Sequence, residues 1–116
     1  MRFALVIGIG VTVLTTAACS GSTSVTGACD GSGAAATVNA TDGLVFSPSS
    51  ATIAHGQAVC WQNIGIMPHT VTSYDGTSFS SGLAAGQMFL HTFPAAGSFP
   101  YRCTIHAGMT GTITVN

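Results

Sequence analysis

One segment near the C-terminal end constrains this chain more than any other. It reads Tyr101-Arg102-Cys103-Thr104-Ile105-His106-Ala107-Gly108-Met109, which places a thiolate, an imidazole and a thioether at the spacing Cys-x2-His-x2-Met. Upstream, the segment Pro68-His69-Thr70-Val71 supplies a second imidazole. Copper suits this set, because a thiolate stabilises Cu(I), imidazoles accept both oxidation states and a thioether is a soft, weak ligand. The sequence therefore predicts a mononuclear copper site formed by His69, Cys103, His106 and Met109.

A zinc site is the first alternative, since a Cys-x2-His pair also occurs in zinc sites. Structural zinc prefers four firm ligands, and the sequence has no second Cys-x2-Cys or His-x3-His pair. The Met at the end of the run also favours copper over zinc. The other alternative treats Cys103 and Met109 as core residues and His106 as a surface residue. The combination of all these ligand types between short apolar runs argues against it.

Four sequence motifs surround the ligands. They are G-x-x-V-x-W-x-N at 56–63, P-H-x-V at 68–71, G-x-[FY]-x-Y-x-C at 97–103 and M-x-G-x-[IV]-x-V at 109–115. With less marked strands before them, they make residues 34–116 resemble a small cupredoxin of the plastocyanin and amicyanin type. The resemblance implies one type 1 copper bound by His69, Cys103, His106 and Met109, with a ligand loop of the same length as in amicyanin. Thr70 stands where many relatives have Asn, so the Thr70 hydroxyl would have to replace the hydrogen bond that the Asn side chain usually makes.

Alternating apolar residues and regularly spaced turns predict an all-β domain. The expected strands are 35–40, 51–54, 58–63, 70–73, 88–93, 99–103 and 111–115, separated by turn residues such as Asp42-Gly43, Asp75-Gly76 and Ala96-Gly97. The resemblance narrows this to a cupredoxin-like Greek-key β-sandwich or barrel. The expected core residues are Phe46, Val59, Trp61, Phe79, Phe93 and Phe99.

The chain carries very little charge. Charged residues make up 4% of the sequence, the formal net charge is −1, and Arg102 is the only basic residue after Arg2. Nucleic-acid binding is therefore excluded, because it requires many phosphate contacts from Lys and Arg. The chain also lacks the acidic patch by which many plastocyanins dock.

The first eighteen residues predict a targeting segment. Arg2 precedes an apolar run, 3–14, and small residues stand directly before Cys19. This resembles a bacterial lipoprotein signal, although Thr16 stands where Leu is more usual. The resemblance implies a signal peptide at 1–18, lipid on Cys19, a Gly/Ser/Thr-rich tether at 19–33 and the domain at 34–116. An uncleaved membrane anchor is the alternative.

Two cysteines remain once Cys19 is assigned to lipid and Cys103 to copper. Cys29 and Cys60 are an even pair in an exported protein, which favours a disulfide over two free thiols. Since Val59 and Trp61 alternate with Cys60, we expect Cys60 to point away from the core.

The function expected is electron transfer, without enzymatic activity, between redox proteins of the cell envelope. We expect a monomer that docks through an apolar patch around His106 and reaches the membrane through its lipid. Copper delivery without electron transfer is the alternative, and a module that has lost its metal is a weaker one. A second copper centre would need more histidines than His55 and His91, which we expect at the surface. Met67 is expected near the pocket or the docking surface but not as a ligand.

Overall fold

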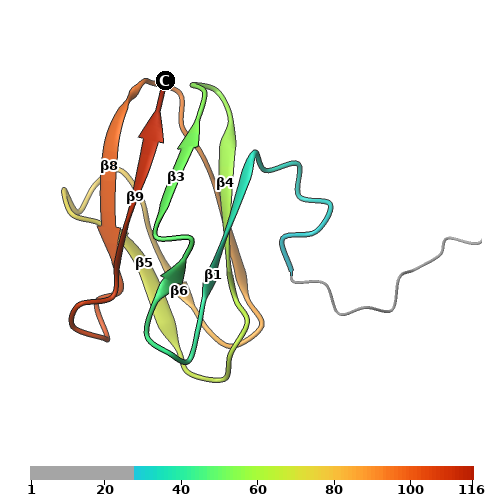
Figure 1. The fold of residues 1–116 in the computed structure, drawn as a ribbon, viewed down its shortest axis with the longest axis vertical. Coiled ribbons are helices and arrows are strands. Elements are labelled where there is room, and N and C mark those ends of the chain that lie inside the picture. Colours follow the sequence, from blue (N-terminus) through green and yellow to red (C-terminus); the bar gives the residue numbers. More distant parts are fainter. Residues whose placement is uncertain (1–27) are drawn as a thin grey trace, which may run out of the picture.

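The computed structural model describes residues 28–116, which form two β-sheets packed face to face (Figure 1). The sheet with the order β2-β1-β4-β7 contains β1 (Ala36–Ala40), β2 (Phe46–Ser47), β4 (Ala58–Asn63) and β7 (Met88–Thr92). The sheet with the order β3-β9-β8-β5-β6 contains β3 (Ser50–Ile53), β5 (His69–Ser73), β6 (Ser80–Leu83), β8 (Gly97–Arg102) and β9 (Thr110–Val115). No helix occurs in this part of the chain, and the all-β sandwich predicted from the sequence is confirmed.

The seven strands expected from the sequence are present, and two further strands were not predicted. The first, β2, has only two residues, so it leaves no alternating pattern. The second, β6, reads Ser-Ser-Gly-Leu and has few residues that favour strands. It forms because it pairs antiparallel with β5, from His69↔Leu83 to Thr72↔Ser80. Both strands therefore form because they pair with neighbouring strands, and not because of their own sequences.

An aromatic cluster centred on Trp61 fills the space between the sheets. Trp61 is fully buried, and its ring centroid lies between 5.3 and 6.4 Å from those of Phe79, Phe89, Phe93 and Tyr101. All the expected core residues are buried except Phe99, which is partly buried and packs against the cluster. Large aromatic side chains dominate the stability of such a core. The loops that carry the expected ligands therefore connect strands that pack on a rigid core.

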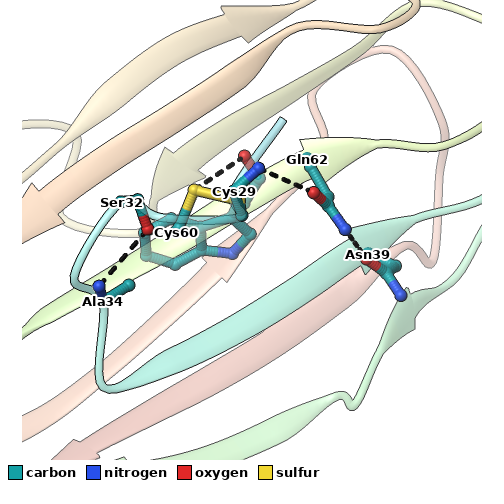
Figure 2. Close-up of a disulfide and its surroundings, with 7 residues drawn as sticks. Cys29, Ser32, Ala34, Asn39, Cys60 and Gln62 are labelled. Atoms are coloured by element: carbon teal, nitrogen blue, oxygen red, sulfur yellow. Dashed lines mark hydrogen bonds between the residues drawn. A yellow bond between two sulfur atoms is a disulfide. The ribbon is translucent and has the colours of Figure 1, made fainter. Parts of the chain in front are cut away.

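A disulfide joins Cys29 to Cys60 on the outer face of β4 (Figure 2). Cys60 and Trp61 are neighbours on β4, so their side chains point to opposite faces of the sheet. Cys60 is nevertheless fully buried, because the segment that carries Cys29 and Ser32 lies over its face. The Cys29 N–H donates to the Gln62 side-chain oxygen at 2.9 Å, and the Gln62 amide donates to Asn39 at 2.7 Å. Residues 28–33, assigned to the tether from the sequence, are therefore fastened to β4.

The expected signal peptide, Cys19 and residues 20–27 of the expected tether lie outside the described residues. Within 28–116, no helix is long and apolar enough to cross a membrane.

The histidines outside the expected ligand set differ in environment. His55 is exposed, with Nδ1 3.0 Å from the Asn116 carbonyl oxygen. His91, expected at the surface, is only partly exposed. Its ring lies partly buried against Phe79 and Phe93, at centroid distances of 5.1 and 4.7 Å, and burial lowers the pKa of His91.

Candidate metal centre

Sheet pairing brings the two expected ligand segments to one pole of the sandwich. Strand β5 begins at His69, and residues 103–109 connect the end of β8 to the start of β9. Because β5 and β8 pair antiparallel, with Thr72 opposite Arg102, the start of β5 lies beside the end of β8. Figure 1 shows the connection between β8 and β9 and the one between β4 and β5 at the same end, opposite the C-terminus.

Three donor atoms converge at this pole. His69 Nδ1 lies 3.2 Å from His106 Nδ1, and Cys103 Sγ lies 3.5 Å from His106 Nδ1 and 3.9 Å from His69 Nδ1. Nitrogen and sulfur ligands at about 2.0–2.3 Å from one first-row metal ion, arranged trigonally, would be about 3.5–3.8 Å apart. The observed spacing therefore fits a single ion. Met109 is buried in the same core cluster as Cys103.

Burial sets the protonation of the first histidine. His69 is 1% exposed, and its Nε2 atom is buried without a hydrogen bond among the described residues. Burial and the facing His106 ring lower the pKa of His69, while Asp42 and the Thr41 backbone act in the opposite direction. The neutral ring is therefore favoured, and neutral imidazole is the form that binds metals.

The Cys103 sulfur is held from β5. The Thr70 N–H donates to Cys103 Sγ at 3.3 Å. The Thr70 hydroxyl accepts the Thr104 N–H at 2.8 Å and lies 3.0 Å from the Thr104 hydroxyl. Thr70 thus joins the two ligand segments with its hydroxyl.

The loop from Cys103 to Met109 is closed by its own backbone. The Cys103 N–H donates to the Met109 carbonyl at 2.9 Å, and the Met109 N–H to the His106 carbonyl at 3.4 Å. Gly108 turns the chain with a φ of +81°, a conformation that strains other residues. A short loop with these bonds holds its ligands without help from distant side chains other than Thr70.

The segment before His69 is fixed in another way. Buried Asn63 donates to the Met67 and Leu83 carbonyls at 2.6 and 2.9 Å, and it accepts the Gly65 N–H at 3.0 Å. The Asp42 carboxylate accepts the N–H groups of Ile66 and Met67, each at 3.0 Å.

The positioning roles of Asn63 and Asp42 were missed from the sequence. Asn63 was recognised only as part of a strand motif, and Asp42 only as a turn residue. A side chain at Gly65 would collide with the Asp42 carboxylate, so this approach requires glycine. The one available signal was a polar Asn at the end of a buried strand.

Comparison with known proteins identifies the family. Residues 33–116 match the family described as copper binding proteins, plastocyanin/azurin family. The chain belongs to this family. Its cofactor is copper, and the donor cluster described above fits one ion.

Similar proteins include a relative by sequence and several solved structures. A plastocyanin from Scenedesmus fuscus is 38% identical over 86 residues, covering 62% of this chain and 87% of that protein. A purple cupredoxin from Nitrosopumilus maritimus is 29% identical with a TM-score of 0.64, covering 70% of this chain and 99% of that one. A reduced amicyanin variant is 25% identical with a TM-score of 0.64, covering 73% and 84%. The resemblance to plastocyanins and amicyanins is therefore confirmed.

An enzyme is also among the similar structures. A copper-containing nitrite reductase from Thermus scotoductus is 26% identical with a TM-score of 0.63, covering 70% of this chain but only 22% of that one. The similarity is thus to a small part of the enzyme.

Proposed function

We propose that this cupredoxin is a mononuclear type 1 copper protein that carries single electrons between redox proteins. His69, Cys103, His106 and Met109 are the proposed ligands. The convergence of His69 Nδ1, Cys103 Sγ and His106 Nδ1 within 3.2–3.9 Å carries the proposal. A thiolate with two imidazoles and a weak axial thioether is the ligand set of blue-copper electron-transfer sites.

The protein's part in this function is to hold the donors still. Bound copper supplies a one-electron couple between Cu(II) and Cu(I). Cys103, Met109 and His69 are buried at 3%, 1% and 1% exposure, so water is excluded from their side of the site. Because the ligands come from two braced segments, their geometry changes little between oxidation states, which lowers the reorganisation barrier.

Electrons enter and leave through His106 in this proposal. His106 is the one partly exposed residue of the donor cluster. Ile64 and Ile66 are 56% and 84% exposed, and Pro68, Ala107 and Gly108 are exposed as well. An exposed apolar patch of this kind is typical of a docking surface. With so little charge nearby, electron self-exchange should vary little with ionic strength.

The proposal excludes catalysis. Within residues 28–116, His69, Cys103 and His106 form the only group of three or more metal-binding side chains of His, Cys, Asp and Glu that lie close together. One copper held by this group is all that the proposed electron transfer requires.

The proposed location is the cell envelope, with the protein exported and attached by lipid on Cys19. The Cys29–Cys60 disulfide supports export, since disulfides persist in oxidising compartments. Mass spectrometry of the membrane fraction tests this, and we expect a mature chain that begins with lipidated Cys19. An unmodified chain in the soluble fraction would contradict the anchor but not the copper function.

Visible spectroscopy tests the copper function. The full chain loaded with Cu(II) should show an intense thiolate-to-copper band that bleaches with a mild reductant and returns on oxidation. Binding of Cu(I) alone, without a coloured oxidised form, would instead indicate copper delivery.

A charge placed in the apolar patch tests the docking surface. Ala107→Glu should slow self-exchange and make it depend on salt, because two copies would then repel each other through this face. Ala96→Glu is the matched control, since Ala96 is also exposed but lies in the turn before β8, at the opposite pole. If Ala107→Glu exchanges electrons as fast as Ala96→Glu, the docking surface lies elsewhere.

A further inference from the structure

A second surface lies beside the metal centre, on the flank of the sandwich. A cleft of about 500 Å³ is lined by Tyr74, Arg102 and residues 103–110. A neighbouring cleft of about 440 Å³ shares Tyr74 and Thr110 with it and continues past Pro100 and Thr112. Tyr74 and Thr110 thus connect the two clefts along β8 and β9. The first cleft meets the apolar patch at Ala107 and Gly108, whereas Ile64, Ile66 and Pro68 of that patch line neither cleft.

Arg102 gives this hollow its chemical character. It is exposed and is the only Lys or Arg among residues 28–116. Its guanidinium lies 5.0 Å from the centroid of the Tyr74 ring. Tyr74 is 50% exposed, so the stacked pair forms part of the surface. Stacking on an aromatic ring holds the planar guanidinium in place and leaves its N–H groups free to bind an anion at its edge.

The nearest carboxylate in the sequence does not neutralise Arg102. Asp75 follows Tyr74, but its carboxylate accepts the hydroxyls of Ser73 and Ser78 and the N–H groups of Thr77 and Ser78. These hydrogen bonds lower the pKa of Asp75 and tie it to its own turn. Asp42 is engaged with the backbone of Ile66 and Met67. In the described domain, Arg102 is therefore a cation without an acidic partner, inside a concave surface.

We propose that the flank of this hollow formed by Tyr74, Arg102 and Thr110 is a second docking surface, which adjoins the apolar patch at Ala107 and Gly108 and receives a surface carboxylate of an acidic redox protein. A guanidinium binds a carboxylate through two parallel hydrogen bonds, which orient the partner as well as attract it. Since the other charged side chains of the described domain are Asp30, Asp42 and Asp75, Arg102 is the single point at which a negative surface is attracted.

The position of Arg102 links this surface to the proposed electron transfer. Arg102 is bonded through its backbone to Cys103, whose sulfur belongs to the donor cluster. A partner seated on Arg102 is therefore one peptide unit from the thiolate. The apolar patch near His106 would serve uncharged contacts and self-exchange, while the Arg102 surface would select acidic partners. This inference rests on the proposed function for its electron path but not for its binding surface.

A binding experiment without copper tests the surface by itself. The copper-free, ¹⁵N-labelled full chain is titrated with an acidic c-type cytochrome, and amide chemical shifts are followed by NMR. We expect shifts at Tyr74, Arg102, Thr104, Thr110 and Thr112. The same titration of Arg102→Gln should show these shifts reduced at least tenfold, because its amide carries no charge. Shifts centred on Ile64 and Ile66, or equal shifts in Arg102→Gln, would overturn the proposal.

A kinetic experiment with the copper-loaded chain tests the electron path. Arg102→Gln should slow electron exchange with the acidic cytochrome about tenfold, corresponding to about 1.4 kcal/mol. Exchange with a basic cytochrome should not slow, because a positive charge facing that partner is removed, and the visible spectrum should not change. Arg102→Lys should recover only part of the rate, since Lys keeps the charge but lacks the paired hydrogen bonds. An unchanged rate with the acidic cytochrome would overturn the path. A chain that binds the cytochrome without any blue band would contradict the carrier function instead.

Discussion

The two segments that meet at the metal centre are held in different ways. The segment before His69 is fixed by side chains from elsewhere, since Asn63 and Asp42 bind its backbone at Gly65, Ile66 and Met67. The segment 103–109 is instead closed by its own backbone, and β5 contacts it through the hydrogen bonds of Thr70 and the ring of His69. The buried histidine is thus positioned by the folding of the whole sandwich. The Cys, the exposed histidine and the Met are positioned by a short loop.

This difference gives the two segments different roles in the metal site. A donor fixed by buried hydrogen bonds stays in place whether or not metal is bound, because breaking them leaves polar groups unpaired. A short loop has fewer such constraints, so its sequence can change the character of the metal without changing the fold. Substitutions in the first segment should therefore mainly affect stability, and those in the loop mainly the spectrum and the potential.

Cys103→Ser should have the largest effect, and this effect should be on copper binding and not on the fold. A serine oxygen is harder than a thiolate and poorly matched to Cu(I), so the intense visible band should disappear completely. The circular dichroism spectrum of the metal-free protein should remain that of a folded β-protein. Absorption spectra of both proteins after copper addition check this. An intense blue band in the variant would show that Cys103 is not the ligand.

Asn63→Ala should do the opposite and reduce stability in the absence of metal. The substitution leaves the buried Leu83 carbonyl and the partly buried Met67 carbonyl and Gly65 N–H without their partner. At about 1–3 kcal/mol for a buried unpaired group, partly relieved by water, we expect a loss of roughly 2–4 kcal/mol.

Urea denaturation of the metal-free chain measures the loss caused by Asn63→Ala. The matched control is Asn39→Ala on β1, where a partly exposed Asn accepts one hydrogen bond from Gln62. Equal losses in the two variants would contradict the special role of Asn63. The comparison of the two segments would then fail.

The outcome for these residues shows how far the sequence could predict the molecule. The proposed ligands, most strands and the core around Trp61 leave local signals, because each combines a characteristic residue type with a regular spacing. Asn63 and Asp42 do not, since their roles depend on loops brought together from different strands. The same holds for β6, which has a weak strand pattern, and for His91, which aromatic rings from other segments cover. The roles of these residues and the formation of β6 depend on contacts between segments that are distant in the sequence.

Met109→Gln should change the potential while leaving the fold intact. The axial thioether is a weak ligand, and an amide oxygen is harder and favours Cu(II), so the reduction potential should fall. Cyclic voltammetry measures the potential, and thermal unfolding of the metal-free protein checks the fold. If the visible spectrum and the potential both stay unchanged, the axial ligand is another group, and Met67→Gln is the next variant to measure.

Thr70→Val should give the smallest effect, and it tests the link that the Thr70 hydroxyl makes between the two segments. The substitution removes the hydroxyl that accepts the Thr104 N–H at 2.8 Å but keeps the side-chain volume and the backbone N–H on Cys103 Sγ. Loss of this hydrogen bond should cost about 0.5–1.5 kcal/mol of stability. The Thr104 amide should then exchange its hydrogen faster. Amides of the core strands β4 and β9 should lose only as much protection as the small decrease in the global free energy of unfolding causes.

Thr70→Ser separates this hydrogen bond from the packing of Thr70. It keeps the hydroxyl and loses only the methyl group, so the Thr104 amide should stay protected. Thr70→Asn offers a longer side chain with its own acceptor and should also protect it. If valine leaves the Thr104 amide as protected as serine does, the loop is held by its backbone alone. The Thr70 hydroxyl would then not link the two segments, and Thr70 would act on the loop only through the N–H that it donates to the Cys103 sulfur.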